Sequence, residues 1–208
     1  MKLQYLYVFL FFFSCTDKIS KDSITNLDKS EFVDTTFKFR NPDDNRILLR
    51  TFKKTDSSDY LNFKYFRKVN NQWTLINHFD TIPIPLGLQL DHQDFNGDNL
   101  ADFTFLADKG ARGSNFYQHL ILYDTIEKHF TFIKGFDSIC APAFDSSQNQ
   151  IIGIGLAGSY RIIDYYKIQR DTIVQDSGVV FEDAKMTERY KFIMGKKVAQ
   201  KVYTDTTR

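Results

Sequence analysis

The residue types best suited to binding chemistry lie in one short stretch, Asp94 to Asp102 (DFNGDNLAD), which places oxygen-bearing side chains at relative positions 1, 3, 5 and 9. A hard cation such as Ca²⁺ takes six to eight oxygen ligands at about 2.3–2.6 Å. Alternate residues of a tightly curled loop can point inward together and supply them. We therefore predict one Ca²⁺ site, with ligands from the side chains of Asp94, Asn96, Asp98 and Asp102 and from the backbone carbonyl of Leu100.

Other interpretations of this stretch are weaker. Mg²⁺ demands strict octahedral geometry and sheds water reluctantly, so it fits the predicted ligand set less well. A plain hairpin turn is the main alternative, because the pair Asn96-Gly97 by itself favours a type I′ turn. Such a turn has no need for Asp at positions 1, 5 and 9, where carboxylates repel one another without a cation. An EF-hand is excluded because position 12 holds Phe105 instead of Glu. We expect the loop to be structural rather than catalytic.

The elements around this loop are predicted to be strands. Tyr60–Val69 alternates apolar and polar residues, meets the turn pair Asn70-Asn71 and is followed by Trp73–Ile76, which is the pattern of a β-hairpin. Two similar hairpins are predicted, from Arg161–Gln169 with Thr172–Gln175 and from Glu188–Ile193 with Lys197–Tyr203. Further strands are predicted at Arg46–Phe52, Leu86–Leu90, Phe103–Ala107, Tyr117–Tyr123, Phe130–Ile133 and Ile151–Leu156.

Helical patterns are nearly absent from the sequence. Only Glu182–Arg189 can form a turn or two of helix. Aromatic residues at 16% and only 4 Pro also favour strands over Pro-rich loops. The predicted fold class is mostly β, an antiparallel meander of hairpins in the form of a partial propeller or barrel-like sheet, with one calcium-loop hairpin.

The N-terminus predicts export. Lys2 precedes an apolar stretch, Leu3–Phe13, which has the length of a secretory signal and falls short of the roughly 20 residues of a permanent membrane span. Ser14-Cys15 then resembles the bacterial lipobox, in which the Cys is lipidated and becomes the mature N-terminus. We predict a lipoprotein signal peptide at 1–14, a lipidated Cys15 and tether at 15–34, and a single β domain at 35–208.

This prediction sets the expected location. Acyl chains such as palmitate on Cys15 would anchor the protein to a membrane of the bacterial cell envelope, with the outer membrane as the expected one. An ordinary signal peptide with an incidental Cys is the alternative.

Several other functions are disfavoured. With 27 Lys plus Arg against 26 Asp plus Glu, the chain lacks the basic excess of a nucleic-acid-binding protein. Once Cys15 carries lipid, Cys140 is the only thiol, and we expect a buried apolar residue rather than a nucleophile. The four His residues have no metal-ligand spacing, and no Gly-x-Ser-x-Gly motif occurs. The sequence does not exclude the paired carboxylates of a glycoside hydrolase, but we expect that the protein is not an enzyme.

The stretch from Asp94 to Asp102, followed by Gly110–Asn115 and the strand Phe116–Tyr123, resembles the FG-GAP/VCBS-type calcium-loop repeat. More narrowly, it resembles a family of exported bacterial proteins with one such loop, which includes calcium-binding lysozyme inhibitor and immunity proteins of xanthomonads. The resemblance covers about Leu86 to Gln175. It implies an antiparallel β fold, a cation in the loop and binding rather than catalysis. The family usually has Gly at position 6, where this chain has Asn99, a residue that tolerates positive φ.

The expected function is therefore that of a lipid-anchored binding protein. The resemblance implies a protein partner, a lysozyme-like glycoside hydrolase, and an inhibitor or immunity role. Two residues are candidates for partner contact: Arg112 could reach carboxylates of such an enzyme, and Tyr160 could anchor an interface. A solvated loop charge is the alternative for Arg112. The alternative function is a carbohydrate-binding or adhesive surface lipoprotein, with a glycan as partner. A hydrolase is the third.

Overall fold

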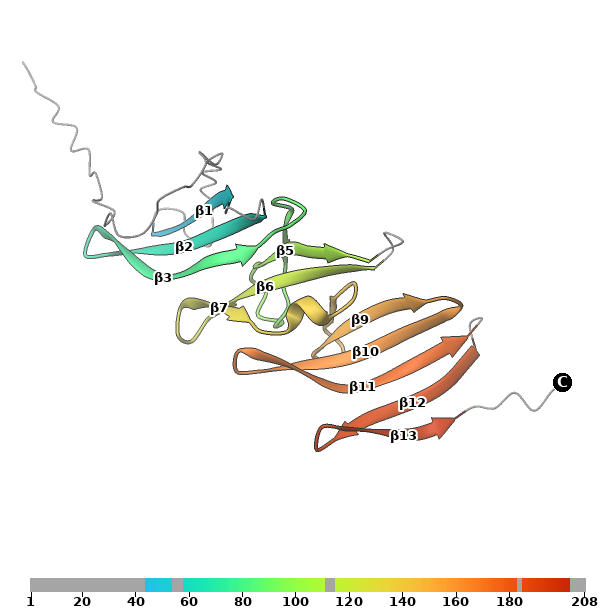
Figure 1. The fold of residues 1–208 in the computed structure, drawn as a ribbon. Helices are drawn as coiled ribbons and strands as arrows, with labels where there is room; N and C mark the ends of the chain where they lie inside the picture. The colour runs from blue at the N-terminus through green and yellow to red at the C-terminus, as the bar shows by residue number, and fades with distance from the viewer. Residues whose placement is uncertain (1–43, 54–57, 111–114, 183–184, 203–208) are drawn as a thin grey trace, which may run out of the picture.

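The computed structural model describes residues 44–53, 58–110, 115–182 and 185–202 (Figure 1). The predicted signal peptide, lipidated Cys15 and tether lie outside these ranges, as does Arg112. No helix within the ranges is long and apolar enough to cross a membrane. The described elements are β1 (Asn45–Lys53), β2 (Asp59–Val69), β3 (Gln72–Pro83), β4 (Leu90–Gln93), β5 (Asp102–Lys109), β6 (Phe116–Asp124), β7 (His129–Ile133), the 3₁₀ helix η1 (Phe136–Ser138), β8 (Ala143–Asp145), β9 (Gln150–Ala157), β10 (Tyr160–Gln169), β11 (Thr172–Glu182), β12 (Lys185–Ile193) and β13 (Lys196–Val202).

The strands form three antiparallel sheets. Sheet A contains β1–β3, sheet B contains β4–β7 and sheet C contains β8–β13. Within each sheet, each strand pairs with its neighbours in the chain, so the predicted antiparallel meander is confirmed. Sheet B lies between the other two (Figure 1). None of the three sheets closes on itself within the described residues, so the fold is a series of open sheets and not a closed barrel.

The predicted hairpins form because their turn residues adopt the required backbone conformation. Asn70 and Asn71 both have positive φ, at 50° and 63°, as a type I′ turn between two strands requires. Met194 and Gly195 do the same between β12 and β13, with φ of 50° and 73°. These turns match the right-handed twist of the strands they join, which keeps each hairpin in register.

Two buried clusters hold the sheets together. Core 1 lies between sheets A and B, and Phe130 of β7 contacts the rings of Phe63, Tyr65 and Tyr123 edge-on at centroid distances of 5.1, 5.0 and 5.0 Å. Core 2 joins sheet B to η1 and sheet C. Its buried members are Phe95, Leu120, Ile133, Phe136, Ile139, Ile151 and Tyr166.

Sheet B contributes to both cores because successive side chains of a strand point to opposite faces. On β6, Ile121 and Tyr123 belong to core 1, whereas Leu120 belongs to core 2. The central sheet is therefore buried on both faces. A segment attached to it, such as the Asp94–Asp102 loop, meets both cores.

Two predicted elements are wrong. Leu86–Leu90 is not a strand: Gly87 has φ of 76° and its N–H bonds to the Ile84 carbonyl at 2.8 Å, so the chain turns there and β4 begins only at Leu90. Glu182–Arg189 forms no helical turn, because Glu182 ends β11 and Lys185 begins β12, which pairs along β11. The short strand β8 and the 3₁₀ helix η1 were not predicted.

Candidate metal centre

The predicted calcium loop connects β4 to β5. Gln93, the last residue of β4, pairs with Asp102, the first residue of β5, so the loop is the end of a hairpin, as predicted. Gly97 has φ of 75° and Asn99 has φ of 62°. Asn99 therefore takes the left-handed conformation that we expected it to tolerate. Asn96 is not among the positive-φ residues, so the plain Asn-Gly type I′ turn is not formed.

The loop curls around its own acidic side chains. Asp94 Oδ1 accepts hydrogen bonds from the N–H groups of Asn96 and Gly97 at 3.1 and 2.6 Å, and Oδ2 accepts one from Asn99 at 2.8 Å. Side-chain acceptors of this kind replace the backbone carbonyls of a regular turn. Asp94 is half-buried, and its carboxylate lies inside the curve of the loop rather than in solvent.

The same pattern repeats at the next two alternate residues. Asn96 Oδ1 accepts from the Asp98 N–H at 3.1 Å, and Asp98 Oδ1 accepts from the Leu100 N–H at 2.9 Å. The Asn96 amide also donates to Asp98 Oδ2 at 3.3 Å and to the Tyr123 carbonyl at 3.2 Å. At each of these alternate positions the side chain folds back onto the backbone two residues further along the loop.

Asp102 has a different environment from the other acidic residues of the loop. It is fully buried, at 0% exposure. Its Oδ2 accepts from the Phe95 N–H and its Oδ1 from the Tyr123 N–H, both at 2.8 Å. One carboxylate thus links the start of the loop to β6. The spacing of the acidic residues indicates Asp102 only as a metal ligand and gives no sign of this second role.

Burial and neighbouring acids shift the ionisation of Asp102. Burial raises the pKa of Asp102 from 3.8 to about 7, the two backbone donors oppose the shift, and the nearby Asp98 and Asp94 raise the pKa further. At neutral pH the protonated and ionised forms are therefore about equally populated. A divalent cation near this carboxylate would favour the ionised form and offset the repulsion among the three acids.

The donor set fits Ca²⁺ in chemistry, since carboxylate, amide and carbonyl oxygens are its usual ligands. Each carboxylate oxygen that accepts one N–H keeps a further lone pair for a metal. Within the described residues, however, no group of three or more His, Cys, Asp or Glu side chains lies close enough to hold a metal ion. The ligand set of Asp94, Asn96, Asp98, Leu100 and Asp102 therefore stays a prediction.

Residues on each side of the loop belong to different cores. Phe95 is 1% exposed, lies in core 2 and meets Phe136 edge-on at a centroid distance of 5.1 Å. Leu100 packs against core 1, and Phe103, next to Asp102, is a buried member of it. Any ligand that orders this loop would therefore act on the junction of the two cores.

Of the remaining predicted site residues, the structure describes only Tyr160. Tyr160 begins β10 in sheet C and is 41% exposed, which suits a surface contact without demonstrating one. Cys140 is a half-buried free thiol, and burial raises its pKa. A raised pKa lowers the thiolate fraction, which disfavours a nucleophile, but the side chain is less buried than we expected.

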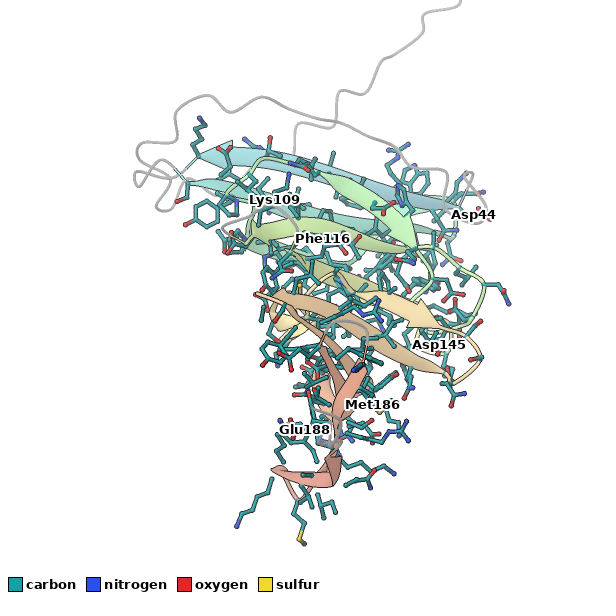
Figure 2. All side chains as sticks on the ribbon, turned by 90° about the vertical axis from the view of Figure 1, so that its right-hand side faces the viewer. Asp44, Lys109, Phe116, Asp145, Met186 and Glu188 are labelled. Atoms are coloured by element: carbon teal, nitrogen blue, oxygen red, sulfur yellow. The ribbon has the colours of Figure 1, made fainter. Side chains whose placement is uncertain are left out.

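A pocket that the sequence did not predict opens on sheet B. Its volume is about 280 Å³, and its lining combines amide, charged and apolar side chains from β4, β5, β6 and the loop before β4. Lys109 and Phe116 are cross-strand partners at adjoining ends of β5 and β6 (Figure 2). The lining residues are Gln89, Leu90, Asp91, Leu106, Lys109, Phe116 and Gln118. They all lie between residues 89 and 118, and the register of the consecutive strands β4, β5 and β6 brings them together.

Comparisons with known proteins give little further information. No family model matches the chain, and no curated protein matches its sequence. Among solved structures, the chain is similar to one described as "Structure of a Xanthomonas Type IV Secretion System related protein", with 12% sequence identity and a TM-score of 0.48. The match covers 79% of this chain and 96% of that one. At so low an identity and TM-score, we infer neither family nor function from this likeness.

Proposed function

We propose that this chain is a lipid-anchored, exported binding protein without enzymatic activity, in which the loop from Asp94 to Asp102 holds a structural Ca²⁺. One observation carries the proposal: the loop curls around alternate acidic side chains and is fixed to β6 by a fully buried carboxylate. An ordinary connection between two strands does not need a buried carboxylate with a raised pKa.

A structural role for the cation follows from what the loop residues already do. Both oxygens of Asp102 accept backbone N–H groups, and Asp94 accepts three. Side chains that are hydrogen-bonded in this way hold the backbone in place and are poorly suited to proton transfer. When bound, Ca²⁺ would supply positive charge among three carboxylates. These residues would hold the ion, and the ordered loop would keep Phe95 and Phe103 in their cores.

The test is thermal unfolding with Ca²⁺ and with chelator. We would use the chain from Cys15, with Cys15→Ser, and compare it with Asp98→Ala. At 100 times its Kd, a ligand of the native state adds about 2.7 kcal/mol, a midpoint shift of about 5–11 °C for a chain of this length. We expect the shift in the parent chain and its loss in Asp98→Ala. Asp108→Ala is the matched control, because Asp108 is an exposed residue of β5 outside the loop. No shift in the parent chain would contradict the proposal.

For the partner, we propose a lysozyme-like glycoside hydrolase, on the basis of the family resemblance of the loop region. Inhibition of a panel of lysozymes by the calcium-loaded chain tests this role. Loss of inhibition on chelation would connect the inhibitory role to the loop. No inhibition of any panel member would exclude the inhibitor role and would not bear on the calcium site. The envelope location is tested separately, by the acylated mass of the N-terminal peptide at Cys15.

Carbohydrate binding is a second candidate, and the pocket on sheet B is the observation that favours it. Amides, a carboxylate, an ammonium group and one aromatic ring are the groups that bind sugar hydroxyls and pack on sugar rings. Glycan binding that is lost in Phe116→Ala, with unfolding unchanged, would support this candidate over the inhibitor role.

A further inference from the structure

The hairpin β12–β13 ends in an exposed apolar turn. It forms the free end of sheet C, away from sheet A (Figure 1). Met194 in the turn is 98% exposed and Ile193, the last residue of β12, is 56% exposed. A methionine this exposed at the tip of a regular hairpin makes no contribution to either core. Its exposure suggests a contact outside the chain.

Lys191, Lys196 and Lys197 lie within three residues of Met194, and two further basic residues lie farther along β12. From Lys185 to Gln200 the hairpin carries five basic residues and one acidic residue, although the whole chain has a formal net charge of only +1. The single acid, Glu188, pairs with Lys197 at 3.2 Å (Figure 2 labels Glu188). The five basic residues are Lys185, Arg189, Lys191, Lys196 and Lys197. Positive charge is thus concentrated on the same hairpin as the exposed methionine.

The strand register places cations on both faces of the hairpin. Lys191 pairs with Val198, and Ile193 pairs with Lys196, so these exposed residues share one face. Lys197, paired with Phe192, lies on the opposite face. A protein partner that packs on one face would meet only some of these charges. Immersion of the whole tip among anionic groups would meet Lys191, Lys196 and Lys197 together.

The turn between β6 and β7 shows that an exposed apolar tip alone is not the signal. Ile126 in that turn is 86% exposed, but Asp124 and Glu127 lie beside it with only Lys128 as a basic neighbour. Of these two turns, only the one between β12 and β13 combines exposed apolar side chains with neighbouring basic residues. The Ile126 turn therefore serves as an internal control.

We propose that the β12–β13 hairpin binds an anionic phospholipid surface, with Met194 and Ile193 entering the interfacial region and the basic residues contacting phosphate groups. Basic residues near an anionic bilayer and apolar side chains at its interface act together in peripheral binding. A second copy of the chain is a poorer partner, because apposed hairpins would bring like charges together. The inference depends neither on the calcium loop nor on Cys15, and it would orient the body of the protein on a membrane.

The test is binding to vesicles of phosphatidylcholine with and without phosphatidylglycerol, measured by co-sedimentation. The chain from Cys15, with Cys15→Ser, retains every described residue and carries no acyl group. We expect binding only to the anionic vesicles. Each lysine near such a surface changes the partition coefficient about fivefold, so Lys191→Gln/Lys196→Gln should weaken binding about 30-fold. Met194→Ser should weaken it severalfold. Ile126→Ser and the charge-matched Lys109→Gln/Lys128→Gln should bind as the parent does.

Other results would overturn the proposal. Equal binding to both vesicle types, or none to either, would exclude anionic lipid as the partner. Loss of binding in the lysine variant but not in Met194→Ser would indicate a general polyanion site without insertion. A concentration-dependent dimer in sedimentation velocity, abolished by Met194→Ser, would assign the tip to a second copy. Raising NaCl from about 0.05 to about 0.5 M shortens the Debye length from about 14 to about 4 Å, and unchanged binding across that range would also contradict it.

Discussion

Replacement of Asp102 should destabilise the protein even when no calcium is present. The side chain is fully buried and accepts the backbone N–H groups of Phe95 and Tyr123, each at 2.8 Å. A buried donor left without an acceptor costs about 1–3 kcal/mol. Asp102→Ala leaves both donors unpaired, so the free energy of unfolding should fall by about 2–6 kcal/mol. Asp102→Asn keeps one acceptor and should lower it by about 1–3 kcal/mol.

The measurement is urea unfolding in chelator at about pH 6, followed by far-UV circular dichroism. At that pH the buried carboxyl, with its pKa raised to about 7, is mostly protonated, so the comparison with Asn contains little charge difference. Asp98→Asn is the matched control: its half-buried side chain bonds within the loop, and water can replace it, so the loss should stay below about 1 kcal/mol. An unchanged urea midpoint in Asp102→Ala would mean that the two N–H groups find other acceptors. The bond between the loop and β6 would then not be what holds the loop in place.

Two further predictions concern other parts of the fold. Burial lowers the pKa of His119, with Asp137 at 3.6 Å opposing the shift, so the folded state favours the neutral ring. The contribution of His119 to stability should therefore be complete above the unfolded pKa of about 6.5 and should fall as the pH drops below that value. In His119→Phe this fall should be smaller than in the parent, and parallel pH curves of the unfolding free energy would refute the assignment. On β9, Gly153→Ala should lower stability by about 1–3 kcal/mol, because a Cβ there would lie 2.6 Å from Ile139 Cγ2. Gly155→Ala, whose Cβ would be 3.8 Å from Cys140 Cβ, should be close to neutral in the same thermal melts, and equal losses at the two positions would contradict the packing argument.

The hairpins could be predicted because their signals are local. Alternating apolar residues and an Asn70-Asn71 pair determine both the strand faces and the turn conformation within about twenty residues. The prediction of a helical turn at Glu182–Arg189 was wrong because its composition is compatible with such a turn, whereas pairing with β11 decides its conformation. Tertiary pairing of this kind overrides weak local propensity. The division into three sheets depends on where consecutive strands stop pairing, between β3 and β4 and between β7 and β8, and the pocket depends on the register of sheet B. Neither gave a signal in the sequence.

The candidate site likewise has features that could be predicted from the sequence and features that could not. The curled loop is predictable because Asp94, Asn96 and Asp98 bond to backbone groups two to five residues further on. The burial of Asp102 and its bond to Tyr123, 21 residues away on another strand, are not predictable from spacing. Spacing therefore suggests which oxygens could meet a cation, whereas only the fold shows which of them is also needed to hold the loop.

The buried bonds of Asp102 are the reason that the cation proposed for the loop would matter for the whole domain. Phe95, whose N–H it accepts, is buried in core 2, and Phe103, the next residue of β5, is buried in core 1. A protonated Asp102 retains less acceptor strength than a carboxylate, so the link between loop and β6 weakens when charge is lost. A bound Ca²⁺ would keep the carboxylate ionised at neutral pH and so strengthen that link. Occupancy of the loop would then stabilise the contact of sheet B with both neighbouring sheets, not the loop alone.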